Sequence, residues 1–173
     1  MRPRECDLVG GIGIIFGSST GNTKDVTLQL QEAVGGEIHD VADVDVSTFE
    51  SYRFLVLVTS TWGMGELQDD WEEFLPSLDS IDLSGKKIAI VGLGDQVNYS
   101  DMFCDSMLIL ADKVVERGAV LVGGTPVDGY SFDNSRAVKD GRFVGLAIDE
   151  DSQSDKTAGR IREWAADLKR EFA

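Results

Sequence analysis

Five short apolar runs rich in β-branched residues recur along this 173-residue chain, and stretches with helical periodicity separate most of them. The runs are Ile12–Phe16, Phe54–Thr59, Ile88–Gly92, Val120–Gly124 and Phe143–Ile148. Strands that alternate with helices in this way are typical of a parallel sheet covered by helices on both faces. The sequence therefore predicts an α/β fold, a three-layer sandwich around a doubly wound, five-stranded parallel sheet.

The segments between the runs carry helix and edge-strand signals. From Val26 onward, apolar residues repeat at helical spacing and stop at Gly35-Gly36, a typical helix end. Two further amphipathic patterns predict helices over Ser100–Gly118 and about Ser154–Phe172. The weaker apolar pattern of Glu37–Val41 predicts a strand at one edge of the sheet.

Residues 125–142 do not fit the alternation, because they are rich in Gly, Asp, Ser and Asn. Within them, Asp140-Gly141 between short apolar flanks predicts a hairpin turn. We interpret this segment as a long insertion that interrupts the last strand, and a structural role and a docking role fit its composition equally well. Residues 1–11 are interpreted as a short polar lead-in to a single domain over residues 12–173.

The chain is strongly acidic, with 16 Lys and Arg residues against 31 Asp and Glu residues and a net charge of −15. This charge disfavours non-specific binding to nucleic acid or to anionic membranes and favours basic partners. Cys6 and Cys104 form no CxxC motif, which indicates two free thiols in a reducing compartment. No apolar stretch approaches the roughly 20 residues that span a bilayer, and no signal-peptide pattern is present. We expect a cytoplasmic monomer.

A turn rich in glycine and hydroxyl groups, Gly17–Thr23, follows the first apolar run and precedes the first helix. Such a turn presents backbone N–H groups, Ser and Thr hydroxyls and the positive end of a helix dipole to an anion. It predicts a phosphate site built mainly from neutral groups, with only Lys24 just beyond the turn. A nucleoside-triphosphate P-loop is disfavoured, because that motif requires Lys after its last glycine, whereas Asn22 follows Gly21 here.

Two further loops with unusual residues, Ser60–Glu66 and Leu93–Asp101, follow the next two apolar runs. In an open α/β sheet, ligands bind beyond the carboxyl ends of the strands, where the strand order reverses. We therefore expect the three loops to converge on one ligand site. The sequence shows no Ser-His-Asp set, no Cys-His pair and no cluster with metal-ligand spacing near these loops. The single histidine, His39, is expected at a surface or edge position.

Together these features resemble the flavodoxin family, in its long-chain form, from about Ile12 to the C-terminus. The segments that carry the resemblance are Ser18–Thr23, Thr61–Trp71, Gly94-Asp95-Gln96, Tyr99, Phe103-Cys104-Asp105, Phe143–Ala147 and Asp149-Glu150-Asp151. Flavodoxins are the standard example of strand order 2-1-3-4-5 with FMN at the point where the order reverses. The strand order and the FMN cofactor are therefore taken from the resemblance.

The resemblance also implies which residues hold the cofactor. It places the flavin ring between Trp62 and Tyr99, and each aromatic ring would add about 1 kcal/mol of stacking. Asp95 is a candidate acceptor for the pyrimidine edge of the flavin, while Trp71 and Trp164 are expected in the core. The expected cofactor-binding residues are Ser18, Ser19, Thr20, Gly21, Asn22, Thr23, Ser60, Thr61, Trp62, Gly63, Met64, Gly65, Leu93, Gly94, Asp95, Tyr99, Met102, Phe103, Cys104 and Asp105.

Gly63 carries a further implication of the resemblance. Flavodoxins turn a backbone carbonyl toward N5 of the flavin when a proton arrives there, which stabilises the neutral semiquinone. The matching peptide here is Gly63-Met64, and glycine visits positive φ at almost no steric cost. A glycine that serves only a tight turn remains the alternative.

Acidic residues surround the two expected flavin loops. Between Phe54 and Asp112 the only basic residues are Lys86 and Lys87, whereas acidic residues are frequent. A negative charge about 10 Å from the reduced flavin disfavours it by about 1 to 2 kcal/mol at an effective dielectric near 20, and by less in salt. The sequence therefore predicts a low potential for the step from semiquinone to hydroquinone and a field that attracts basic partners.

The predicted function is a low-potential one-electron carrier that binds FMN noncovalently and has no substrate of its own, because the cofactor supplies the redox step. The resemblance implies a donor similar to ferredoxin–NADP reductase or pyruvate oxidoreductase. It implies a reductase or nitrogenase-type acceptor in photosynthetic, biosynthetic or nitrogen-fixing electron transfer.

Two alternatives remain from other functional classes. A flavodoxin-like NAD(P)H:quinone reductase would bind FMN in the same fold, but Trp62, Tyr99 and the acidic rim would hinder an anionic nicotinamide nucleotide. A phospho-acceptor signalling domain requires Asp at the end of the third strand, where Thr59-Ser60 stands instead.

Overall fold

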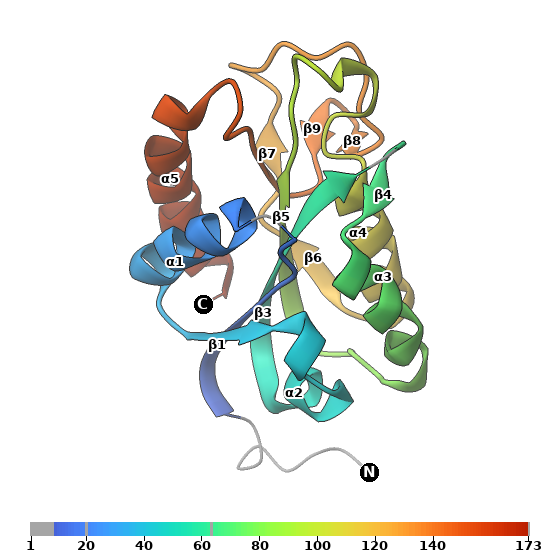
Figure 1. Cartoon of the computed structure of the whole chain (residues 1–173). Helices are drawn as coiled ribbons and strands as arrows, with labels where there is room; N and C mark the ends of the chain where they lie inside the picture. The colour runs from blue at the N-terminus through green and yellow to red at the C-terminus, as the bar shows by residue number, and fades with distance from the viewer. Residues whose placement is uncertain (1–8, 20, 63, 173) are drawn as a thin grey trace.

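The computed structural model describes residues 9–19, 21–62 and 64–172. Its centre is a sheet with the strand order β10-β5-β3-β1-β2, and every pair of neighbouring strands in this order is parallel (Figure 1). These strands are β1 (Val9–Phe16), β2 (Glu37–Asp40), β3 (Tyr52–Trp62), β5 (Lys87–Leu93) and β10 (Leu146–Ile148). A further strand, β6 (Val120–Val122), pairs with β5. The order confirms the expected 2-1-3-4-5, with β6 and β10 together forming the fifth strand.

Helices cover both faces of the sheet and confirm the predicted three layers (Figure 1). One face carries α1 (Asn22–Val34) and α5 (Ser154–Phe172), whose apolar residues form one cluster with the sheet. The other face carries α2 (Val46–Ser51), α3 (Asp69–Phe74), α4 (Ser106–Glu116) and the 3-10 turns η2 (Val41–Asp43) and η3 (Leu75–Ser80). None of the helices in the described ranges is long and apolar enough to cross a membrane.

The middle segments of the central strands are apolar because each supplies side chains to both layers. On β3, Leu55 and Leu57 belong to the cluster under α2, α3 and α4, whereas Val56 and Val58 belong to the cluster under α1 and α5. All four side chains are completely buried. Successive side chains of a strand point to opposite faces, so a sheet covered on both sides has no solvated face and no polar alternation.

The fifth strand is split as predicted. β6 pairs with residues 87–89 of β5, and β10 pairs with residues 91–93. The insertion between them forms a small antiparallel sheet of β7 (Thr125–Pro126), β9 (Arg142–Phe143) and β8 (Val138–Lys139). Asp140 and Gly141 have φ values of 53° and 77°, which confirms the predicted hairpin turn.

The predicted run Phe143–Ile148 was wrong as one continuous strand, because Phe143 pairs within the insertion and only Leu146–Ile148 joins the central sheet. Gly145 lies at the break. A Cβ atom there would lie 2.0 Å from the carbonyl oxygen of Ile90 on β5, so only glycine permits this close approach of the two backbones.

The predicted helix over Ser100–Gly118 also begins later than its apolar pattern suggested. A 3-10 turn, η4 (Ser100–Met102), comes first, and α4 starts only after Cys104, whose φ is 55°. A residue in the left-handed region cannot continue a right-handed helix. Val115, which was counted in the apolar stripe of this helix, is half exposed.

Three further predictions about single residues, for Trp71, Trp164 and His39, are confirmed. Trp71 and Trp164 are buried, and their indole N–H groups donate to the carbonyls of Val58 and Gly123 at 2.8 Å in each case. β2 is an edge strand, and His39 on it lies partly exposed beside the hydroxyl of Tyr52.

The contact at Gly145 predicts a large effect of one methyl group. Gly145→Ala is expected to lower the free energy of unfolding by about 3 kcal/mol, because the new Cβ displaces backbone atoms that cannot move aside. Urea unfolding followed by circular dichroism measures this. Gly159→Ala is the control, since the added group meets no atom within 4 Å apart from its chain neighbours and the backbone of its own helix, and the change stabilises α5 by up to about 1 kcal/mol. Equal stability of Gly145→Ala and the parent chain would contradict the prediction.

Candidate functional site

A cavity of about 370 Å³ opens at the carboxyl edge of the central sheet. Its lining residues come from the start of α1, the end of β3, the loop after β5 and the turn after β10. They are Asn22, Thr23, Ser60, Thr61, Trp62, Leu93, Gly94, Asp95, Tyr99, Met102, Cys104, Glu150 and Asp151. The three loops singled out in the sequence therefore supply residues to one cavity.

The first loop leads into the N-terminus of α1. Gly17 passes so close to Gln68 and Trp71 that a Cβ would lie 2.1 Å from the amide oxygen of Gln68. At the turn itself, the backbone N–H of Gly21 donates to the hydroxyl of Ser18 at 3.1 Å. Within the described residues no side chain caps α1, so the amides of its first turn are available to an anion.

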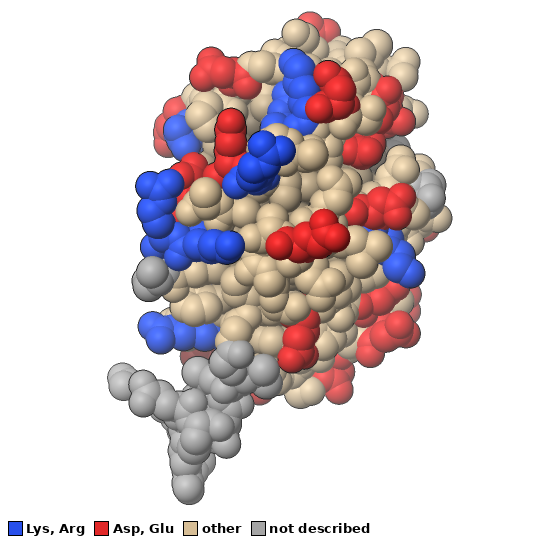
Figure 2. All heavy atoms as spheres, turned by 90° about the vertical axis from the view of Figure 1, so that its left-hand side faces the viewer, with Lys and Arg blue, Asp and Glu red and all other residues tan. Residues whose placement is uncertain are grey.

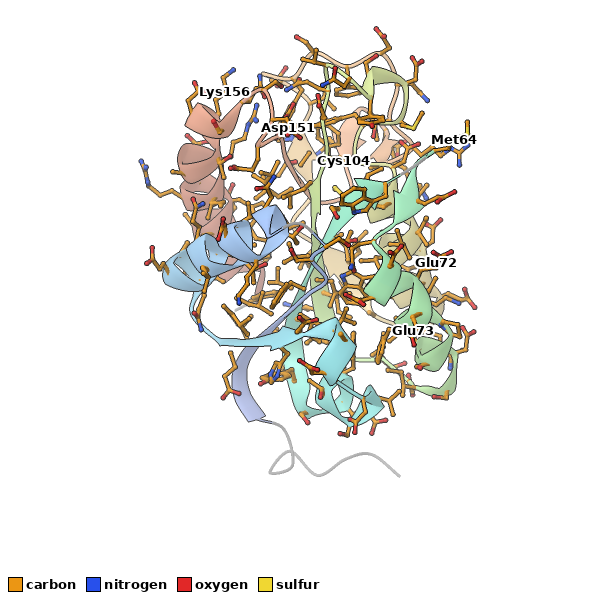
Figure 3. All side chains as sticks on the ribbon, viewed as in Figure 1. Met64, Glu72, Glu73, Cys104, Asp151 and Lys156 are labelled. Carbon is orange, nitrogen blue, oxygen red and sulfur yellow. The ribbon has the colours of Figure 1, made fainter. Side chains whose placement is uncertain are left out.

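The second loop is the end of β3 and its hairpin to β4 (Glu66–Leu67), closed by a hydrogen bond from the Gly65 amide to the Trp62 carbonyl at 3.1 Å. The indole N–H of Trp62 donates to the hydroxyl of Ser60 at 2.7 Å, and the residue as a whole is 40% exposed. Met64 is 80% exposed and points away from the molecule (Figure 3).

Hydrogen bonds to the Asp95 side chain shape the third loop. Its carboxylate accepts from the amides of Val97 and Asn98 and from the side chain of Asn98, at 2.7 to 3.0 Å. Burial opposes this charge, but the hydrogen bonds outweigh burial and lower the pKa of Asp95. The carboxylate proposed for the pyrimidine edge of a flavin is thus already used to fold its own loop. Tyr99, farther along, is 55% exposed at the cavity mouth.

Several expected site residues do not line the cavity. Phe103 is completely buried and stacks on Phe132 of the insertion, with ring centroids 5.3 Å apart. Asp105 is buried beside Arg136, whose backbone amide donates to its carboxylate at 2.7 Å. The other expected residues outside the lining are Ser18, Ser19, Gly21, Met64 and Gly65. Thr20 and Gly63, and with Gly63 the expected peptide flip, lie outside the described residues.

Two carboxylates in the lining, Glu150 and Asp151, were missing from the expected site residues. They follow β10, so the rule that ligands bind beyond strand ends would have found them if it had been applied to the fifth strand as well. Burial raises the pKa of Asp151, and the charges of Asp95, Asp149 and Glu150 raise it further. Among the residues that the structure describes, the cavity lining contains three carboxylates and no Lys, Arg or His.

Cys104 lines the cavity, and its completely buried thiol donates weakly to the carbonyl of Gly92 at 3.6 Å. Burial raises the pKa of this thiol, and the charges of Asp149 and Asp105 add to the effect. The thiol is therefore neutral at pH 7 and contributes an apolar surface. Across the described residues, no three His, Cys, Asp or Glu side chains are grouped to hold a metal ion.

Comparisons with known proteins agree with this geometry. A family model described as flavodoxin matches residues 14–164. The flavodoxin of Synechococcus elongatus is 46% identical over 165 residues, covering 93% of this chain and 97% of the relative. A Nostoc flavodoxin is 43% identical over 164 residues, which cover 93% of this chain and 96% of that relative.

A solved structure gives the same result. The crystal structure of Fusobacterium nucleatum flavodoxin bound to flavin mononucleotide superposes with a TM-score of 0.90 at 32% identity, covering 94% of this chain and 99% of that chain. The chain therefore belongs to the flavodoxin family.

Proposed function

We propose that this chain binds FMN noncovalently in the cavity at the carboxyl edge of the sheet and carries single electrons at low potential between redox proteins. The observation that carries the proposal is the meeting of a helix N-terminus, two exposed aromatic rings and three carboxylates around one cavity of about 370 Å³. The likeness to the FMN-bound flavodoxin of Fusobacterium nucleatum supports it.

The phosphate of FMN would be held at the first turn of α1. Asn22 and Thr23 line the cavity there, and the uncapped amides and the positive end of the helix dipole favour a negative group. The loop before α1, which includes Ser18, would complete this end of the site. No cation is needed, because oriented N–H and O–H dipoles supply the attraction.

The ring of FMN would lie against Trp62 and Tyr99, above the apolar surface of Met102 and Cys104. Both aromatic side chains are exposed, and a flat heteroaromatic ligand would cover them and gain stacking. FMN, when bound, supplies the one-electron chemistry. The residues of the chain bind it, orient it and exclude water.

The charges of the lining set the potential. Asp95, Glu150 and Asp151 repel any added negative charge in the cavity, each by about 1 to 2 kcal/mol at about 10 Å and an effective dielectric near 20. Addition of the second electron is therefore unfavourable, which makes the reduced carrier a strong donor. The same charges disfavour an anionic nicotinamide nucleotide, so we propose a carrier and not a quinone reductase.

The docking surface for basic redox partners is the hairpin β3–β4 with the adjoining helix α3. Exposed Met64 provides an apolar contact at the tip of the hairpin, and Glu72 and Glu73 lie farther away, on α3 (Figure 3). These two residues are exposed, as are Glu66 on β4 and Asp69 at the start of α3. The face that carries α1 and α5 differs, because Lys and Arg side chains are interspersed there with acidic ones (Figure 2). This asymmetry orients an approaching basic reductase toward the flavin cavity.

We further propose that residues 12–173 act as one domain, as a monomer and in the cytoplasm. The two apolar clusters share the same central strands, which supports a single domain. Cys104 is a buried free thiol, which suits a reducing compartment.

Removal of the aromatic rings tests the ring site. Trp62→Ala and Tyr99→Ala are each expected to weaken FMN binding about five- to tenfold, because each removes one stacking surface worth about 1 kcal/mol. Quenching of flavin fluorescence by the apoprotein measures the dissociation constant. Tyr52→Phe, at the opposite end of β3, is the control and keeps the parent affinity. Unchanged affinity in both alanine variants would place the ring elsewhere.

Reduction kinetics test the carrier role and the docking surface. NADPH alone is expected to leave the flavin oxidised, whereas added ferredoxin–NADP reductase reduces it at a rate that falls with salt. The double variant Glu72→Gln/Glu73→Gln is expected to be reduced several-fold more slowly at low salt. The double variant Glu163→Gln/Asp167→Asn, on the exposed side of α5, removes the same number of negative charges and is expected to keep the parent rate. Rapid reduction by NADPH without a partner would favour the reductase class instead.

A further inference from the structure

A completely buried carboxylate, Asp149, lies directly after β10. It accepts hydrogen bonds from the amide and side-chain N–H of Gln96 at 3.1 and 2.8 Å, and from the amides of Asp151 and Ser152 at 3.1 and 2.9 Å. The Ser152 hydroxyl is a fifth donor. None of the ion pairs within the described ranges includes Asp149.

A carboxylate is unfavourable to bury without a cation, and such a charge persists only where several donors satisfy it. At Asp149 the donors belong to two separate loops. Gln96 lies in the loop that carries Asp95 and Tyr99, and Ser152 follows the turn that carries Glu150 and Asp151. Asp95, Tyr99, Glu150 and Asp151 line the cavity, whereas Gln96 and Ser152 do not. One buried group therefore fixes two walls of the site against each other.

The same network extends into the insertion. The side-chain oxygen of Gln96 accepts from the amide of Ser131 at 2.6 Å, and the hydroxyl of neighbouring Tyr130 donates to the carbonyl of Ala147 at 2.6 Å. Gln96 thus donates hydrogen bonds to Asp149 and accepts one from the insertion through its side-chain oxygen. If Gln96 loses its contact with Asp149 or its contact with the insertion, a buried polar group is left without a hydrogen-bond partner.

The charge of Asp149 also reaches the cavity. Burial raises the pKa of the Cys104 thiol, and Asp149 is the largest charge contribution to that rise. Cys104 lines the cavity. Because Asp149 is shielded from solvent, salt screens its field less than the field of an exposed carboxylate.

We propose that Asp149 is a positioning residue of the flavin site: its buried carboxylate holds the loop 95–99 and the turn 150–152 in place and sets a fixed negative charge beside the cavity. This inference rests on the proposed FMN site. The carboxylate takes no part in electron or proton transfer. It acts through the loops that it fixes and through its field, which opposes the second electron.

The first test is Asp149→Asn in the FMN-loaded protein. The Asn side chain keeps the size but removes the charge and turns an NH₂ group toward N–H donors. The dissociation constant of oxidised FMN is expected to rise at least tenfold. The equilibrium constant for adding the second electron is expected to rise about tenfold, equivalent to 59 mV for a one-electron couple. Asp155→Asn, an exposed residue in the first turn of α5, removes the same charge and is expected to change neither value more than twofold.

The second test is Gln96→Leu, which leaves the Asp149 charge in place and removes the bridge to the insertion. FMN is expected to bind at least tenfold more weakly, while the second-electron constant stays within twofold of the parent. Independently of FMN, trypsin is expected to cut the apoprotein several-fold faster at Arg136 and Lys139 in the insertion. This proteolysis result tests the anchor even if Asp149→Asn fails to fold.

The outcomes separate this inference from the proposed function. Parent protein that takes up no FMN would contradict the function, while faster proteolysis of Gln96→Leu would still support the anchor. Parent protein that binds FMN, with Gln96→Leu unchanged in affinity and proteolysis, would overturn the anchor alone. A second-electron constant for Asp149→Asn within twofold of the parent would overturn the charge effect.

Discussion

Parallel pairing of β1, β3, β5 and β10 is the constraint on which the site depends. Parallel strands end at the same edge, so segments far apart in the sequence must meet there without any direct sequence signal. The N-terminus of α1, the hairpin after β3, the loop after β5 and the turn after β10 all lie at this edge. The loops that follow these strands lie at the surface of the protein. The strands themselves are buried, and a buried turn would leave its backbone polar groups without hydrogen-bond partners.

Local chemistry explains which parts of the fold the sequence could predict. Gly35 ends α1, Asp140-Gly141 makes the β8–β9 turn, and the apolar periodicity of α5 gives its bounds, because each of these signals acts within a few residues. The split of the last strand was visible for the same reason. A break in apolar pattern is a local feature.

Long-range contacts explain what the sequence left out. Phe103 fits a helical period with the residues of α4, yet it is buried against Phe132 of the insertion and precedes the helix. The left-handed Cys104 and the close approach of Gly145 to Ile90 have no local signature either. Glu150 and Asp151 belong to a segment that carries the family resemblance, but the expected site residues came from the loops after β1, β3 and β5 and not from the turn after β10, the last part of the fifth strand.

We propose that negative charge around a noncovalently bound flavin separates its two reduction steps. The most direct measurement is a reductive titration of the FMN-reconstituted protein followed by visible spectra. The account predicts a long-lived blue one-electron form and a second midpoint far below the first and below that of free FMN. A single two-electron step without a blue form, or a protein that stays colourless when mixed with FMN, would contradict it.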